Sequence, residues 1–415
     1  MDLINKYYSQ PGYQPSDAIL QRQQYLFYIR GVKFNRYYLF PAAFLIQICV
    51  GSFYAFSGLT LPIEQFIYGP NGNIDRSIAA NVFYVCIGVF GITAAIGGPI
   101  LERYGPFVGS IVGSVFFFIG NLLSGLGVYL KAIEVVFVGY GLFCGIGIGF
   151  AYVAPVSALQ KWFPEARGFS AGIAVGGVAV GTIIAPFTQN WFIDRFGVAM
   201  MFVILGCIYF AVMAVFSLVM RMPPPGYSVK GVTIQTIRGT ESLSKTAIVT
   251  TNKEMGSVEI EEATIEENPS EVIIRNNLSF TMTMMEAIAS MDYRLMWLMF
   301  LGSQITGILI VSKIQPICIN QFETNKTTAA FINSLIGVAN VIGRVVIPMI
   351  SDLLPRLTGN VVGRKSIFLL SLVVQLVTVA LLPTSITTQN FPAFLAFVGA
   401  WYAKKKKEKK QYNTL

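Results

Sequence analysis

The chain has 415 residues, of which 54% are hydrophobic and 12% are charged, with a formal net charge of +9. A soluble domain carries about 25% charged residues, so this composition excludes an ordinary soluble protein and indicates one embedded in a membrane. The sequence contains no histidine, which removes the commonest metal ligand and the commonest proton shuttle. We therefore predict no metal site and no cofactor.

Apolar runs long enough to cross a lipid bilayer recur along the chain. About 20 helical residues cross a hydrocarbon core of about 30 Å. The N-terminal residues show no basic segment followed by an apolar one, so no cleavable signal peptide is predicted and the first span has to direct insertion. The predicted spans are 39–62, 78–101, 107–130, 133–157, 168–191, 197–220, 294–316, 328–350 and 366–386, with a short tenth at 391–403.

The basic residues of the loops predict the orientation. Most lysines and arginines fall on one side if the N-terminus is cytoplasmic, and the predicted outer loops then hold only Arg76, Lys131, Arg195 and Lys326. Such a bias is typical of cytoplasmic loops. The positive charge therefore indicates membrane topology, and no nucleic-acid partner is inferred from it.

The predicted spans fall into two groups separated by a polar segment. The segment 221–292 opens with RMPPPGY and contains VEIEEATIEENPSE, a composition that predicts a disordered cytoplasmic linker. Six spans before a linker and more after it are the plan of a transporter built from related halves. We thus expect a cytoplasmic tail at 1–36, an N-terminal six-helix bundle at 37–220, an incomplete C-terminal bundle at 293–403 and a basic tail at 404–415.

The basic tail has two interpretations. AKKKKEKKQYNTL would suit a natural end with affinity for anionic lipid headgroups. We favour the alternative, a frameshifted or mispredicted gene end, because two further spans are expected of a two-bundle plan.

Two charged loops occupy equivalent places in the two halves. GGPILERYGP follows the second span, and GRVVIPMISDLLPRLTGNVVGRK surrounds the end of the eighth. Either loop alone is compatible with a simple solvated turn, but the pair resembles the paired loop signature of the major facilitator superfamily, in which such charges lock neighbouring helices in one state. The residues concerned are Gly98, Glu102, Arg103 and Gly105 in the first loop and Asp352, Gly363 and Arg364 in the second.

Three longer segments resemble one family within that superfamily. IQICVGSFYAFSG, GYGLFCGIGIGFAYVAP and KWFPEARGFSAGIAVGGVAVG are similar to segments of the oxalate/formate antiporters, which are related to the monocarboxylate transporters. The resemblance covers about residues 37–385. It implies an all-α, two-bundle membrane fold with about ten helices here, a transporter and not an enzyme, with a small organic anion as its substrate, the lipid bilayer as its surroundings and no obligate protein partner.

Arg344 lies inside an apolar run, where an unpaired charge is costly. It precedes Asp352 by eight residues, and at 1.5 Å per helical residue this places it about 12 Å from the end of the span, near the bilayer midplane. Three interpretations compete: snorkelling toward the interface, a contact with backbone carbonyls, and an anion site. We favour the anion site because a guanidinium offers a planar fork that suits a carboxylate.

The resemblance assigns neighbours to this arginine. It implies that Arg344 and Asn340, four residues apart on one helix face, hold the substrate carboxylate in a central cavity. Tyr54 and Tyr152 match aromatic residues of that cavity, although a tyrosine taken alone is more often plain helix packing, and Val178 stands where many family members have an aromatic residue.

The same positions bear on the coupling mode. Related proton-linked monocarboxylate transporters carry an aspartate where this chain has Asn340, which cannot titrate, and no predicted span has an acid near its centre. We therefore predict exchange or facilitated diffusion. A proton-linked monocarboxylate transporter and a truncated, non-transporting paralogue or sensor stay as alternatives.

Small residues are expected to pack the helices. Gly168, Gly172 and Gly176, like Gly177 and Gly181, recur every four residues, which allows two helices to approach backbone to backbone and is compatible with their sliding. Four of the five cysteines fall in predicted spans, and Cys318 lies two residues beyond one. They show no paired spacing, and we expect all of them to act as small apolar packing residues.

Overall fold

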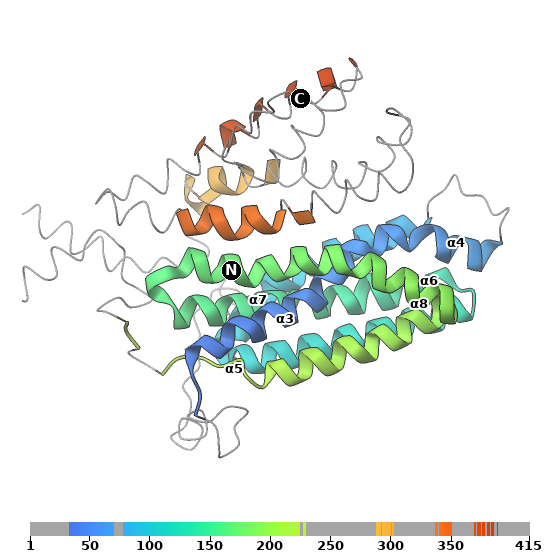
Figure 1. Ribbon diagram of the computed structural model, residues 1–415, viewed down its shortest axis with the longest axis horizontal. Helices are drawn as coiled ribbons and strands as arrows, with labels where there is room; N and C mark the ends of the chain where they lie inside the picture. Colours follow the sequence, from blue (N-terminus) through green and yellow to red (C-terminus); the bar gives the residue numbers. More distant parts are fainter. Residues whose placement is uncertain are drawn as a thin grey trace, which may run out of the picture.

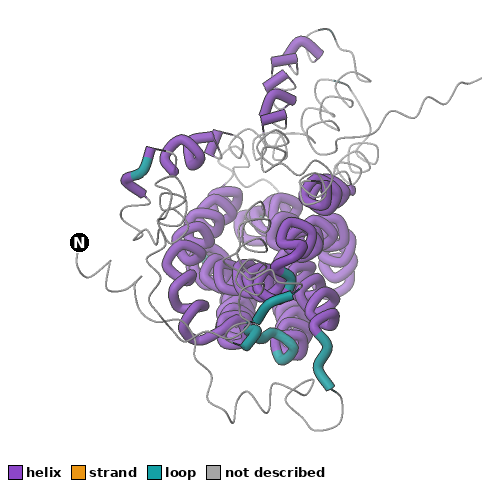
Figure 2. Tube along the Cα trace, turned by 90° about the vertical axis from the view of Figure 1, so that its left-hand side faces the viewer, coloured by secondary structure: helices purple, strands orange, loops and turns teal. Residues whose placement is uncertain are grey.

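The computed structural model describes residues 33–69, 78–224 and 227–229, together with shorter stretches between 288 and 388. Within these residues every regular element is helical, as Figure 2 shows. The all-α architecture predicted from the sequence is therefore confirmed. The predicted linker, the basic tail and several predicted spans of the second half lie wholly or largely outside the described residues.

The N-terminal helices run along a common direction and form one bundle (Figure 1). The chain enters the bundle through a 3₁₀ turn capped by Asn35, whose Oδ1 accepts a hydrogen bond from the backbone N–H of Tyr37 at 3.2 Å. The elements in order are η2 (Arg36–Tyr38), α3 (Leu39–Gly51), η3 (Ser52–Gly58), α4 (Thr60–Tyr68), α5 (Ile78–Tyr129), α6 (Ile133–Val136), η5 (Phe137–Cys144), α7 (Gly145–Trp162), η6 (Pro164–Ala166) and α8 (Arg167–Ser217).

Two of these helices are too long for a single crossing, and each turns back at a glycine. Gly105 in α5 has φ 83° and ψ 166°, and Gly197 in α8 has φ 80° and ψ 166°, values essentially restricted to glycine. Both turns carry the order acid, arginine, aromatic, glycine, as ERYG and DRFG. Because α5 and α8 each make two passes, the described residues 36–217 hold two double and two single passes, six in total.

The single passes are not regular α-helices throughout. The first changes from α3 to the 3₁₀ segment η3 before α4 resumes, and the other contains η5, a π-helical segment, between α6 and α7. Such departures are frequent at functional positions of helices. In this protein the 3₁₀ segment η3 precedes α4 and contains Tyr54. The π-helical segment η5 precedes α7, and α7 contains Tyr152.

Glycines bring the helices of the bundle into backbone contact. A methyl group on Gly113 in α5 would lie 2.8 Å from the carbonyl oxygen of Gly147 in α7, and one on Gly177 in α8 would lie 2.5 Å from the carbonyl oxygen of Phe44 in α3. Gly181 likewise has no room for a side chain beside α3. The glycine pattern therefore packs the bundle tightly, since close approach is a main source of helix association in lipid.

The outer surface of the bundle is apolar. Ile92 and Phe187, for example, are 62% and 65% exposed. Cys49, Cys86 and Cys144 are buried packing residues as predicted, but the prediction is wrong for Cys207, which lies exposed on α8. The outside of a helical bundle in lipid can be as apolar as its inside, so an apolar sequence pattern does not separate the two. Cys318 lies outside the described residues.

Candidate functional site

Arg344 and Asn340 meet as the sequence predicts. Both lie on a short apolar helix, Asn340–Ile350, and the Nε of Arg344 donates a hydrogen bond to the Oδ1 of Asn340 at 2.7 Å. Both side chains are half-buried. Because this bond uses Nε alone, the terminal nitrogens on the far edge of the guanidinium point away from Asn340, and that edge has the geometry that binds carboxylates.

The backbone of Arg344 rests against α8. A methyl group on Gly172 would lie 2.5 Å from the carbonyl oxygen of Arg344, and one on Gly176 would lie 3.2 Å from the Cγ2 of Val345. Gly177 and Gly181 face α3 instead. The two glycine rows of α8 thus serve different neighbours, one within the bundle and one on the helix that carries Arg344.

Of the two tyrosines named from the sequence, Tyr54 lies near this arginine and Tyr152 lies near Tyr54. Tyr54 is within electrostatic range of both Tyr152 and Arg344. The ring of Phe90, on α5, lies 5.5 Å from that of Tyr152, and the ring of Phe53 lies 4.0 Å from that of Tyr54. The structure therefore brings together three of the predicted site residues, Asn340, Arg344 and Tyr54. Tyr152 lies beside Tyr54, and aromatic rings from α5 and η3 pack against the two tyrosines.

Two residues beside this group escaped the sequence reasoning. Phe90 was indistinguishable from other apolar residues of its span. Gln47 is a fully buried amide on α3, and its Nε2 donates to the carbonyl oxygen of Tyr152 at 2.8 Å. A glutamine within the apolar run LFPAAFLIQICVG was the available signal. Val178, in turn, is buried, and its backbone lies against Gly51.

The first charged loop forms an ion pair between helices. Nζ of Lys161, at the end of α7, lies 2.6 Å from Oε1 of Glu102 on α5. Sequence reasoning grouped Glu102 with Arg103, whereas its partner comes from the segment KWFPEARG. Gly105 provides the turn, and Gly98 faces open space. Asp352, Gly363 and Arg364 of the second loop lie outside the described residues.

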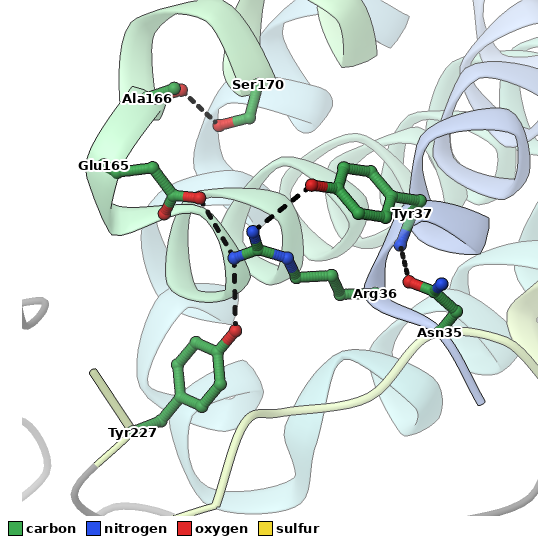
Figure 3. Close-up of polar contacts among 7 residues, drawn as sticks. All are labelled: Asn35, Arg36, Tyr37, Glu165, Ala166, Ser170 and Tyr227. Carbon is green, nitrogen blue, oxygen red and sulfur yellow. Dashed lines mark hydrogen bonds and ion pairs between the residues drawn. The ribbon is translucent and has the colours of Figure 1, made fainter. Parts of the chain in front are cut away.

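Arg36 joins three segments at the same end of the bundle. Its Nη1 lies 3.0 Å from Oε1 of Glu165, between α7 and α8, and 3.4 Å from the hydroxyl of Tyr227, which follows α8 (Figure 3). Its guanidinium carbon also stands 4.8 Å from the centre of the Phe163 ring, a cation–π contact. The start of the first helix and the segment after the last are therefore on one side.

Arg221 reinforces this cluster from the end of α8. It is only 1% exposed, its guanidinium stacks over the ring of Phe34 at 4.0 Å, and its Nε donates to the carbonyl oxygen of Val219. The indole Nε1 of Trp162 donates to its carbonyl oxygen at 2.8 Å. A cation at a helix C-terminus satisfies carbonyls that lack helical partners. We call Phe34, Arg36, Trp162, Phe163, Glu165, Arg221 and Tyr227 the terminal cluster.

The residues that the structure describes contain no group of three or more potential metal ligands. What they do contain is a set of apolar helices of membrane-crossing length with an apolar outer surface, which defines an integral, multi-pass membrane protein. The sequence model of the Major Facilitator Superfamily matches residues 39–403, so the chain belongs to this superfamily of membrane transporters. Family and fold indicate a transporter rather than an enzyme.

Individual relatives are distant. The chain is 23% identical over 324 residues to the uncharacterized MFS-type transporter YhjX of Escherichia coli. This match covers 77% of this chain and 67% of that protein. It is 28% identical to monocarboxylate transporter 12 of Xenopus laevis over 99 residues, 24% of this chain and 21% of that one. Among solved structures, the proton:xylose symporter XylE bound to 6-bromo-6-deoxy-D-glucose matches with a TM-score of 0.57 at 16% identity, over 89% of this chain and 78% of that one, which supports the fold alone.

Proposed function

We propose that the protein transports small organic anions, mono- or dicarboxylates such as oxalate and formate, by exchange or facilitated diffusion with alternating access. The observation that carries the proposal is the guanidinium of Arg344, held by Asn340 at 2.7 Å and within electrostatic range of Tyr54. A half-buried cation inside an apolar helix requires a counter-charge, and a carboxylate substrate supplies one.

The surrounding groups suit this role. The oxygen of Asn340 fixes the Nε edge of the guanidinium, which leaves the other edge to receive two carboxylate oxygens side by side. The tyrosines 54 and 152 add hydroxyl groups that can donate to an anion. A stretch of 99 residues is similar to monocarboxylate transporter 12, and the name of that relative is consistent with a carboxylate substrate.

The titratable groups favour uniport or exchange over proton symport. Within the six described passes the carboxylates lie near helix ends; Glu64, which is buried, accepts the backbone N–H of Ala79 at 3.0 Å and so caps the start of α5. The partner of Arg344 is an amide, which carries no proton to the other side. We further propose that the terminal cluster faces the cytoplasm, in agreement with the basic loops.

The test is counterflow of labelled oxalate and of labelled formate into proteoliposomes. Arg344→Gln should abolish uptake above background, and Arg344→Lys should retain a minor part of it, because a lysine keeps the charge but loses the fork. Arg195→Gln is the matched control, since Arg195 is an exposed cation beside the Trp191 ring on α8 and should transport like the parent. Parental uptake by Arg344→Gln at matched expression would disprove the proposal.

A further inference from the structure

Gln47 presents a hydrogen-bond acceptor that nothing in the described structure satisfies. The side chain is 0% exposed, and its Oε1 has no hydrogen-bond partner. Its Nε2 donates to the carbonyl oxygen of Tyr152 at 2.8 Å. A carbonyl oxygen only accepts, so the amide cannot be reversed and the Oε1 atom has to point away from α7.

An apolar side chain would be the better choice if this position served packing alone. Leucine or methionine fills a similar volume without burying an acceptor, and buried polar groups without partners are rare in native proteins. The acceptor therefore calls for a donor that the described residues do not provide. A resident water molecule or a group of the transported molecule can supply one.

The contacts of α8 place Gln47 at the depth of Arg344. Methyl groups on the adjacent residues Gly176 and Gly177 would touch Val345 and Gln47, respectively. Val345 directly follows Arg344, so the arginine and the glutamine lie at neighbouring levels on two sides of the same helix. Gln47 also stands seven residues before Tyr54, which is within electrostatic range of Arg344. It is bonded to the backbone of Tyr152, which is within electrostatic range of Tyr54.

The groups around this point have unlike chemistry. Arg344 offers N–H donors to a carboxylate, whereas the Oε1 of Gln47 accepts and repels one. A ligand that satisfies both carries a carboxylate and, within a few bonds, an O–H donor. We propose that Gln47 is a specificity-determining residue of the central site, and that its Oε1 accepts a hydrogen bond from a hydroxyl group of the substrate. This inference rests on the proposed transport of carboxylates and, within that class, favours hydroxycarboxylates over oxalate and formate, which have no hydroxyl group at neutral pH.

Glycolate and acetate provide the test, because they share a two-carbon carboxylate and differ by one hydroxyl group. The dissociation constant of each is measured by calorimetric titration of the purified full chain in detergent. The parent should bind glycolate at least about ten-fold more tightly than acetate, because acetate leaves the buried acceptor unpaired. Gln47→Leu and Gln47→Met should bring the two constants together mainly by weakening glycolate, while acetate binding is kept.

Gln189→Leu is the matched control. Gln189 is a second buried glutamine and lies near the Gly197 end of the first pass of α8, so its replacement should keep the preference for glycolate. A preference for glycolate that survives in both Gln47 variants would overturn the inference and leave a resident water as the partner. Equal weakening of both ligands would also overturn it, because a packing defect acts on both. If the parent binds neither carboxylate, the proposed function itself fails.

Discussion

Gly172 of α8 lies so close to Arg344 that a methyl group on it would approach the arginine carbonyl oxygen to 2.5 Å. The helix bearing the proposed anion site is thus seated by its main chain on a glycine of the N-terminal bundle. Main-chain atoms cannot rotate away as a side chain does, so the position of Arg344 depends on the missing side chain at Gly172.

Gly172→Ala should therefore displace the Arg344 helix and impair carboxylate binding. We expect at least a ten-fold rise in KM for uptake, with a smaller change in kcat, since the anion site is shifted and not removed. Gly176→Ala is the matched control: its methyl group would meet the Cγ2 of Val345 at 3.2 Å, and that side chain can give way. Equal KM values for Gly172→Ala and the parent would contradict this role.

The pair of Glu102 and Lys161 links α5 to α7 at the end of the bundle that holds the terminal cluster. Glu102 is 54% exposed, so the pair contributes little to stability, under about 1 kcal/mol. We expect the ion pair to hold α5 and α7 together in one state of the transport cycle. Lys161→Glu should slow uptake several-fold with an unchanged melting temperature, and the double variant Glu102→Lys with Lys161→Glu should restore part of the rate. A double variant as slow as the single one would show that the pairing itself is unimportant.

The terminal cluster predicts the topology of two segments outside the described residues. Arg36, Glu165 and Tyr227 are in contact, so the N-terminal tail and the segment after α8 start on the same side of the membrane. Epitope tags at the N-terminus and within 230–287 should both be accessible to antibody only after permeabilisation. A tag at 70–77, between α4 and α5, should be accessible in intact cells. Labelling of the first two tags in intact cells would refute a cytoplasmic location.

The sequence predicted the helices and the local partners better than the contacts between distant segments. The spacing of four residues between Asn340 and Arg344 sufficed to predict their contact, because a helix brings such residues together. The turn at Gly105 followed from its glycine. By contrast, the partner of Glu102 lies 59 residues away, and no local pattern distinguished Lys161 from Arg103. Gln47 was missed because burial of an amide depends on three helices packing around it.

Asn340→Asp tests whether the amide keeps the anion site independent of pH. At neutral pH the new carboxylate would pair with Arg344, since the two atoms now bonded are 2.7 Å apart, and this internal pair would compete with the substrate. Anion uptake should fall at least ten-fold.

Protonation removes the competing charge, so the ratio of variant to parent uptake should rise as the pH is lowered toward the pKa of the new aspartate. The parent, with an amide at this position, should lack this increase, and dividing by its rate corrects for protonation of the substrate itself. The measurement is initial uptake of labelled oxalate into proteoliposomes over a series of external pH values. A constant ratio across the series, at any level of uptake, would mean that residue 340 does not face the anion through Arg344.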